Sequence, residues 1–231
     1  METAGHRRWP PVDTSHLLDP GKTCQQAVVR ADEARLPGVD DQRILLAARY
    51  FNRNNFIVES TRGLGRRGAL PPLIAQLSSK FPDVQHYSAR ALYRLAANSE
   101  NHARIRVEGG IGPLIELLSS RHEPCQRGAV MTLCNLATDA NNCAAMAQQN
   151  AIITLVMLLD SDSVPVARYA VMCLTNLAAV DSNQVPIVAA KAVQPLVELS
   201  KSKDLDTQRY CGMCLCNLSA HPDNRRYMTT Q

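Results

Sequence analysis

The hydrophobic and polar positions of this 231-residue chain follow a helical pattern that returns every 41 residues. In each period one segment has an apolar or small residue, of the kind usually buried, at positions i, i+4, i+8 and i+11. This is the spacing of a stripe along one face of an α-helix. The four stripes are Val84, Ser88, Leu92 and Leu95; Cys125, Ala129, Leu133 and Leu136; Val166, Ala170, Leu174 and Leu177; and Thr207, Cys211, Leu215 and Leu218. Copies in strict register predict an all-α solenoid, in which stacked units bury one continuous core.

The second period, residues 98–138, predicts three helices. A short first helix is expected over 101–108. It ends at Gly109-Gly110, because glycine reaches the left-handed conformation that follows a helix C-terminus. A second helix is expected over 111–119, with Pro113 in its first turn, where the missing amide costs nothing. After a polar turn, a longer third helix is expected from about 123 to 137.

Two recurring positions mark the helix ends. The counterparts of Gly109 are Gly68 and Asn150, since asparagine also tolerates the left-handed conformation, whereas Lys191 departs from this pattern. A second series recurs near the start of each first helix, where asparagine is expected to cap the helix N-terminus. Its members are Asn101, Asn142, Asn183 and Asn224.

The 41-residue period divides the chain into repeats and flanking segments. Four repeats are predicted at about 57–97, 98–138, 139–179 and 180–220, followed by a partial repeat at 221–231. Residues 41–56 align with a third helix and are expected to be a degenerate capping helix, and residues 1–40 form an N-terminal tail that is expected to be partly disordered. An end without a polar capping repeat predicts a truncated form, or an apolar face that associates with another chain.

The motif Gly-Gly-Ile-Gly-Pro-Leu-Ile-Glu-Leu-Leu (109–118), followed by Ala-Val-Met-Thr-Leu-Cys-Asn-Leu-Ala (129–137), resembles the armadillo repeat. The resemblance covers about residues 57–220. HEAT repeats, the nearest rival, usually have two helices and lack the Gly-to-Pro start of the second helix. The resemblance implies a right-handed α-α superhelix of about four three-helix repeats, with the third helices along the concave surface.

Positions two residues after the buried stripe are expected to line that surface as columns spaced by 41 residues. The triplets are Leu45, Arg49 and Arg53; His86, Arg90 and Arg94; Arg127, Met131 and Asn135; Arg168, Met172 and Asn176; and Arg209, Met213 and Asn217. Asparagine offers a donor and an acceptor to an extended peptide backbone, arginine pairs with carboxylate or phosphate, and methionine supplies an adaptable apolar floor. These columns predict a groove for an extended acidic or phosphorylated segment of a partner protein. Arginine, asparagine and methionine each have a second interpretation here, namely solvated surface, helix-end bonding and core packing respectively.

The function expected from this groove is that of a non-enzymatic adaptor or scaffold. Cargo importers of the armadillo family carry Trp four residues before the groove asparagine and have acidic groove walls. Met and Arg stand there in this chain, so it is more similar to the catenin-like and vacuolar adaptor branch than to importin-alpha. Three alternatives stay open: a nuclear transport receptor of the importin-alpha type, a substrate-binding fragment of a larger protein such as a ubiquitin ligase, and a cytoskeletal or ciliary docking component.

Composition adds little chemistry. The net charge of +4 is too small to indicate nucleic acid as a partner, although residues 1–110 hold 16 Lys/Arg against 11 Asp/Glu. The eight cysteines alternate with Ser, Thr and Ala in the repeat, which favours small core residues in a reducing compartment, cytoplasmic, nuclear or cytoskeleton-associated. Cys211, Cys214 and Cys216 form the one metal-like cluster, but no second cysteine pair completes it. We expect no metal, no cofactor, no transmembrane segment and no catalytic group.

Overall fold

The computed structural model describes residues 69–229, which are all-helical and contain no strand. The twelve α-helices are α4 (Leu70–Ala75), α5 (Pro82–Leu95), α6 (His102–Val107), α7 (Ile111–Leu117), α8 (Glu123–Leu136), α9 (Ala140–Gln148), α10 (Ala151–Met157), α11 (Val164–Ala178), α12 (Asp181–Ala189), α13 (Val193–Leu199), α14 (Leu205–Ser219) and α15 (Pro222–Met228). Single turns of 3-10 helix are η1 (Gln76–Ser78), η2 (Ser99–Asn101) and η3 (Leu158–Asp160). The predicted tail at 1–40 and capping helix at 41–56 lie outside the described residues.

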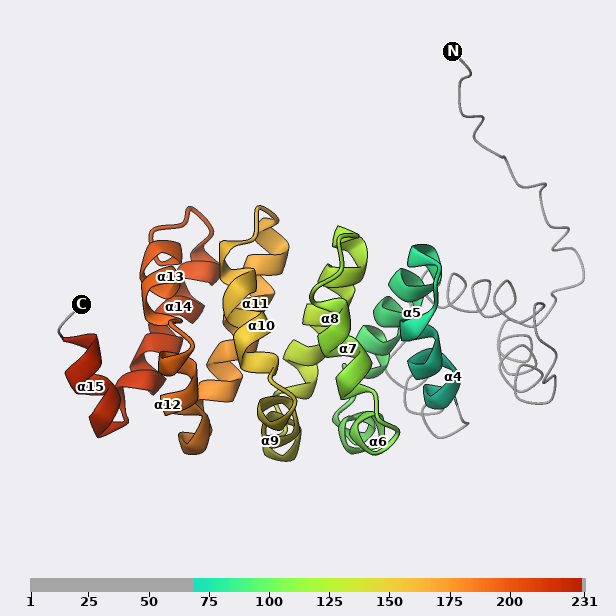
Figure 1. Ribbon diagram of the computed structural model, residues 1–231, viewed down its shortest axis with the longest axis horizontal. Helices are drawn as coiled ribbons and strands as arrows, with labels where there is room; N and C mark the ends of the chain where they lie inside the picture. The colour runs from blue at the N-terminus through green and yellow to red at the C-terminus, as the bar shows by residue number, and fades with distance from the viewer. Residues whose placement is uncertain (1–68, 230–231) are drawn as a thin grey trace, which may run out of the picture.

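The helices form stacked three-helix units, namely α6–α8, α9–α11 and α12–α14. In Figure 1 the units follow one another along the long axis from α4 to α15, with the short first helices α6, α9, α12 and α15 along the lower edge. The long helices α5, α8, α11 and α14, called the third helices below, pack side by side in chain order. The predicted all-α solenoid is therefore confirmed.

The core runs along the whole stack. Fifteen of the sixteen residues in the predicted stripes are buried. The exception is Leu215, which is only partly buried on α14. Within the described residues no further third helix packs against α14, so the side chain keeps some exposure there.

The helix bounds predicted for the second unit are confirmed to within two residues. Helices were expected over 101–108, 111–119 and 123–137, and α6, α7 and α8 span 102–107, 111–117 and 123–136. The differences fall at helix ends, where the last backbone groups form 3-10 bonds or turns instead of regular α-helical bonds.

A left-handed residue separates the first from the second helix in each complete unit. Gly109 has φ +75°, Asn150 has φ 61° and Lys191 has φ 66°. Bonds in the third of these turns run from Lys191 N–H to the Val188 carbonyl (2.9 Å) and from Ala192 N–H to the Ile187 carbonyl (3.4 Å). This pairing of backbone groups caps the last carbonyls of the helix. The turn thus has the same left-handed geometry even where lysine replaces glycine.

The buried asparagine series acts differently from the prediction. Each member donates its side-chain N–H to the carbonyl of a leucine six residues earlier, at the end of the preceding third helix. The pairs are Asn101–Leu95 (2.9 Å), Asn142–Leu136 (3.1 Å), Asn183–Leu177 (3.1 Å) and Asn224–Leu218 (2.9 Å). The side chains therefore cap a helix C-terminus, and the prediction of N-terminal capping was wrong. Position alone could not separate the two, because both kinds of cap place asparagine between the same two helices.

The second asparagine series, Asn135, Asn176 and Asn217, joins neighbouring units. Each side chain donates to a third-helix carbonyl 42 residues earlier: Asn135 to Tyr93 (3.4 Å), Asn176 to Cys134 (3.3 Å) and Asn217 to Thr175 (3.3 Å). The Tyr93 and Cys134 carbonyls need this donor, since the backbone N–H four residues later bonds to the following carbonyl instead. These amides therefore fix the register of one third helix against the next.

Among the described residues, no individual helix combines the length and apolarity of a membrane span. One helix pair, Ala140–Gln148 with Ala151–Asp160, passes on length and composition together but is bent by 85°.

The lysine in the left-handed turn generates a first prediction. Replacing Lys191 with glycine should raise the free energy of unfolding by about 0.5–1 kcal/mol, because a residue with a Cβ pays roughly 1–2 kcal/mol for this conformation and glycine does not. Urea unfolding followed by circular dichroism measures the change. Ala190, with φ −73°, provides the matched control: Ala190→Gly should lower stability. Equal effects of the two substitutions would contradict the strained turn.

The asparagine bonds between units generate a second prediction. Asn176→Ala should lower the free energy of unfolding by about 0.5–1.5 kcal/mol, since it removes the donor from the Cys134 carbonyl. The exposed Asn141, for which no side-chain hydrogen bond is seen, is the control, and Asn141→Ala should leave urea unfolding nearly unchanged. Full stability of Asn176→Ala would show that the bond between units contributes nothing.

Candidate functional site

The predicted groove residues share one surface of the third-helix layer, opposite the buried stripes. We call this surface the third-helix face and define it by the following residues. His86, Arg90 and Arg94 lie on α5; Arg127, Met131 and Asn135 on α8; Arg168, Met172 and Asn176 on α11; and Arg209, Met213 and Asn217 on α14. Arg90, Arg209 and Met213 are exposed and the others half-buried. Arg49 and Arg53, predicted for the same surface, lie outside the described residues.

The asparagine column consists of Asn135, Asn176 and Asn217, whose side-chain amides each make one hydrogen bond within the solenoid and keep other polar atoms accessible. One N–H of each amide is used by the preceding third helix, as described above. The Oδ1 atoms bond to no described residue and are not buried, in contrast to the fully buried Oδ1 of Asn142. Each amide thus keeps an acceptor and a second N–H for an outside group while its position is fixed by the first bond.

The methionine column changes along the stack. Met131 and Met172 are half-buried, and Met172 packs against the core, whereas Met213 is 47% exposed. A thioether on a flexible side chain adapts to differently shaped apolar groups. The column therefore offers apolar surface mainly at its α14 end.

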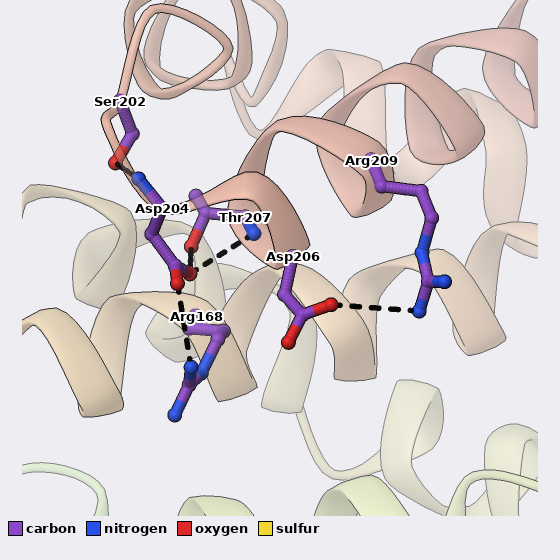
Figure 2. Close-up of polar contacts among 6 residues, drawn as sticks. All are labelled: Arg168, Ser202, Asp204, Asp206, Thr207 and Arg209. Atoms are coloured by element: carbon purple, nitrogen blue, oxygen red, sulfur yellow. Dashed lines mark hydrogen bonds and ion pairs between the residues drawn. The ribbon is translucent and has the colours of Figure 1, made fainter.

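The arginine column is less positive than the sequence suggests, because each member pairs with a carboxylate. The Nη1 atom of Arg127 lies 3.4 Å from Oε1 of Glu123, and Nη1 of Arg168 lies 3.5 Å from Oδ1 of Asp204. The Nη2 atom of Arg209 lies 3.7 Å from Oδ1 of Asp206. Figure 2 shows the last two pairs side by side at the start of α14. Asp204 also accepts bonds from the backbone and hydroxyl of Thr207, and the hydroxyl bond is the main reason that the pKa of this carboxyl is lowered, with Arg168 adding to it. The charge of these three arginines is largely balanced within the chain.

The α5 end differs in charge. Arg90 and Arg94 form no ion pair with any described residue, so their guanidinium groups keep their full donor capacity. His86 lies one turn before Arg90 on the same helix. The free positive charge of the third-helix face is therefore concentrated at α5 within the described part of the chain.

Two tyrosines from different third helices influence each other. Burial is the main cause that raises the pKa of Tyr169, on α11, and Tyr93, on α5, adds to it. The helix α8, which packs against both α5 and α11, carries Gly128 at the position that holds Tyr169 in the next unit. The sequence analysis missed this contact and the acidic partners Glu123, Asp204 and Asp206. A signal for the tyrosine was present, since Tyr87, Tyr169 and Tyr210 recur at the interval of the repeat with glycine only at 128.

The cysteines are mostly core residues. Of the seven described, six are buried and only Cys216 is exposed, and all seven are free thiols. Burial raises the pKa of Cys134 and of Cys214 to about 12, so both stay protonated and unreactive at neutral pH. Cys216 is exposed while Cys211 and Cys214 are buried, so these three do not share one surface. Over residues 69–229, no group of three or more His, Cys, Asp or Glu side chains is close enough to hold a metal ion.

Comparison with known proteins identifies the repeat. The family model described as Armadillo/beta-catenin-like repeat matches residues 65–97 and 98–138. No curated protein sequence matches the chain.

Solved structures extend the likeness over most of the chain. The crystal structure of an engineered protein has 27% sequence identity and a TM-score of 0.76, covering 85% of this chain and 79% of that one. A computationally designed armadillo repeat protein for modular peptide recognition has 23% identity and a TM-score of 0.80, covering 92% of this chain and 87% of that one. A designed armadillo repeat protein in complex with peptide (KR)4 has 23% identity and a TM-score of 0.79, covering 90% and 87%. At 23% identity these two designed proteins show the fold alone.

The matched repeat sequences, the stacked three-helix units and the shared fold lead to one conclusion: residues 65–138 match the Armadillo/beta-catenin-like repeat, and the described residues form a helical solenoid with the armadillo fold.

Proposed function

We propose that the third-helix face binds an extended, acidic segment of a partner protein, and that the chain is a non-enzymatic adaptor or scaffold. The observation that carries the proposal is the alignment of arginine, methionine and asparagine into columns on one surface of the packed helices α8, α11 and α14. An extended segment lying across these helices would meet the same three residue types at each of them.

The asparagine column supports recognition of a peptide backbone. A strand without a sheet partner has N–H and C=O groups that need hydrogen bonds when they leave water. The Oδ1 and the second N–H of Asn135, Asn176 and Asn217 supply one acceptor and one donor at each unit, on amides already held by the preceding helix. Such contacts do not depend on the partner's side chains.

The side-chain columns support a preference that changes along the face. Arg90 and Arg94, which form no ion pair with a described residue, favour carboxylates or phosphates at the α5 end, because guanidinium pairs with both in a bidentate manner. Exposed Met213 favours an apolar residue at the α14 end. The partner segment inferred here is therefore acidic in one part and apolar in the other.

A lysine-rich segment, as expected for a nuclear transport receptor, fits less well. Such a segment needs available carboxylates. Glu123, Asp204 and Asp206 are each paired with an arginine of this chain, and Glu123 also accepts a bond from the Ser163 hydroxyl (2.9 Å). A basic segment would have to compete with these arginines for the carboxylates.

The similar designed structures support an extended peptide as the ligand, but they do not support an acidic one. One designed armadillo protein is described as made for modular peptide recognition and another as a complex with the basic peptide (KR)4. We extend to this chain only the idea of an extended peptide as ligand. The free thiols of seven described cysteines support a reducing compartment, which we propose to be the cytoplasm or nucleus, or a cytoskeletal structure within the cell.

The charge preference is the third prediction. A fluorescein-labelled octapeptide of alternating Glu and Leu should bind at least about tenfold more tightly than one of alternating Lys and Leu, measured by fluorescence anisotropy at low salt, where exposed charges act most strongly. The double variant Arg90→Glu/Arg94→Glu should remove most of this preference.

The matched control has the same change of charge on first helices. Arg104 on α6 and Arg225 on α15 are replaced by Glu together, and this variant should keep the preference for the acidic peptide. Circular dichroism melting verifies that both variants fold. Tighter binding of the Lys peptide, or equal loss of binding in the two variants, would contradict the proposal.

A further inference from the structure

His86 connects two third helices at the end of the face where the positive charge is free. Its Nδ1 lies 3.0 Å from the carbonyl oxygen of Pro124, at the start of α8. Its ring also makes an edge contact with the ring of His122, with the centroids 6.4 Å apart. The side chain is half-buried, and its Nε2 bonds to no described residue and is open to solvent.

The hydrogen bond to Pro124 decides which ring nitrogen carries the proton. A carbonyl oxygen can only accept, so Nδ1 must donate. In the neutral ring Nε2 then has a lone pair and no hydrogen, and it repels a carboxylate. In the protonated ring both nitrogens are donors, and Nε2–H can bond to a carboxylate.

The surroundings of His86 are positive. Arg90 on α5, with His122 and Arg127 on the α8 side, all act to lower its pKa. No carboxylate among the described residues acts on the ring: Glu123 is paired with Arg127, and Asp83 acts on Cys125 instead. Among residues 69–229 this positive cluster has no counter-ion apart from Glu123, so an incoming anion would supply the missing charge.

We propose that His86 and Arg90 form a proton-dependent subsite for a carboxylate of the bound segment, in which protonation turns Nε2 from an acceptor into a donor. The inference rests on the proposed function and specifies how one part of the face works. Arg94, one further turn along α5, lies next to this subsite and extends the favourable charge.

The direction of the pH dependence follows from the charges. Burial of the ring is the main cause that lowers the pKa of His86 from 6.5, and the neighbouring cations lower it further, while the Pro124 bond opposes them. A bound carboxylate favours the protonated ring and so raises this pKa in the complex. The contribution to binding is therefore complete below the pKa of the free protein and is lost as pH rises through the pKa of the complex. Glutamate side chains, with a pKa near 4.3, stay ionised through this range.

The test compares the affinity of the Glu/Leu octapeptide at pH 5.5 and pH 7.5. The unmodified chain should bind more tightly at pH 5.5, by up to about tenfold, the limit set by a rise of about one unit in the pKa of His86 on binding. His86→Asn keeps an N–H near the position of Nδ1 for the Pro124 carbonyl but does not titrate, so its affinity should not change between the two pH values. His86→Lys should bind well at both.

Two further measurements separate this subsite from other causes. His122→Gln removes the neighbouring imidazole and leaves His86 in place, so the pH dependence should remain. Titration of the His86 ring by NMR should show its pKa rising when the octapeptide is added. An unchanged pKa, or a pH dependence that survives in His86→Asn, would overturn the inference.

Failure of the subsite is distinguishable from failure of the proposed function. Binding of the octapeptide at pH 7.5 that depends on Arg90 and Arg94, without a contribution from His86, would overturn only the subsite. Absence of binding at both pH values, in all variants, would overturn the third-helix face as a site for acidic segments.

Discussion

The side-by-side packing of the third helices, held in register by one side-chain amide per unit, is the constraint on which the rest of the structure depends. Asn135, Asn176 and Asn217 each reach back to a carbonyl of the preceding third helix. This bond satisfies a backbone carbonyl at a helix end. It also fixes the register between neighbouring third helices, so that equivalent side chains take equivalent positions in each unit. Columns of like residues exist only because this register is kept.

The buried amides at the start of each first helix support the same arrangement. Asn101, Asn142, Asn183 and Asn224 tie the start of a first helix to the end of the third helix before it. The Asn101 series therefore links the third helix of one unit to the first helix of the next unit. The Asn135 series links neighbouring third helices across the stack. Together they fix both the bend and the spacing, which apolar packing of alanine, leucine and cysteine alone would define less sharply.

The sequence was sufficient for the fold because a repeated pattern reports the same structure several times. Stripe residues and helix bounds are local properties, and four copies reduce the ambiguity of any one. Lys191 shows a limit: the residue type argued against a left-handed turn, but packing of the unit imposed it. The pairing of Arg168 with Asp204 shows another, since these residues are 36 positions apart and nothing in the repeat marks Asp204 as an acidic position. Periodicity carries no information about pairs of non-repeating residues such as these.

Charge distribution gives the face its direction. Among the described residues the arginines without an ion pair lie on α5 and the exposed methionine lies on α14. Under the proposed function the two ends would contact different parts of one segment. The most direct test is NMR paramagnetic relaxation, with a spin label at one end of the Glu/Leu octapeptide and the side-chain amides of the protein observed. We expect the amide signals of Asn135, Asn176 and Asn217 to broaden, with little effect on the amide signals of the first and second helices. Broadening confined to α7, α10 and α13 would contradict it.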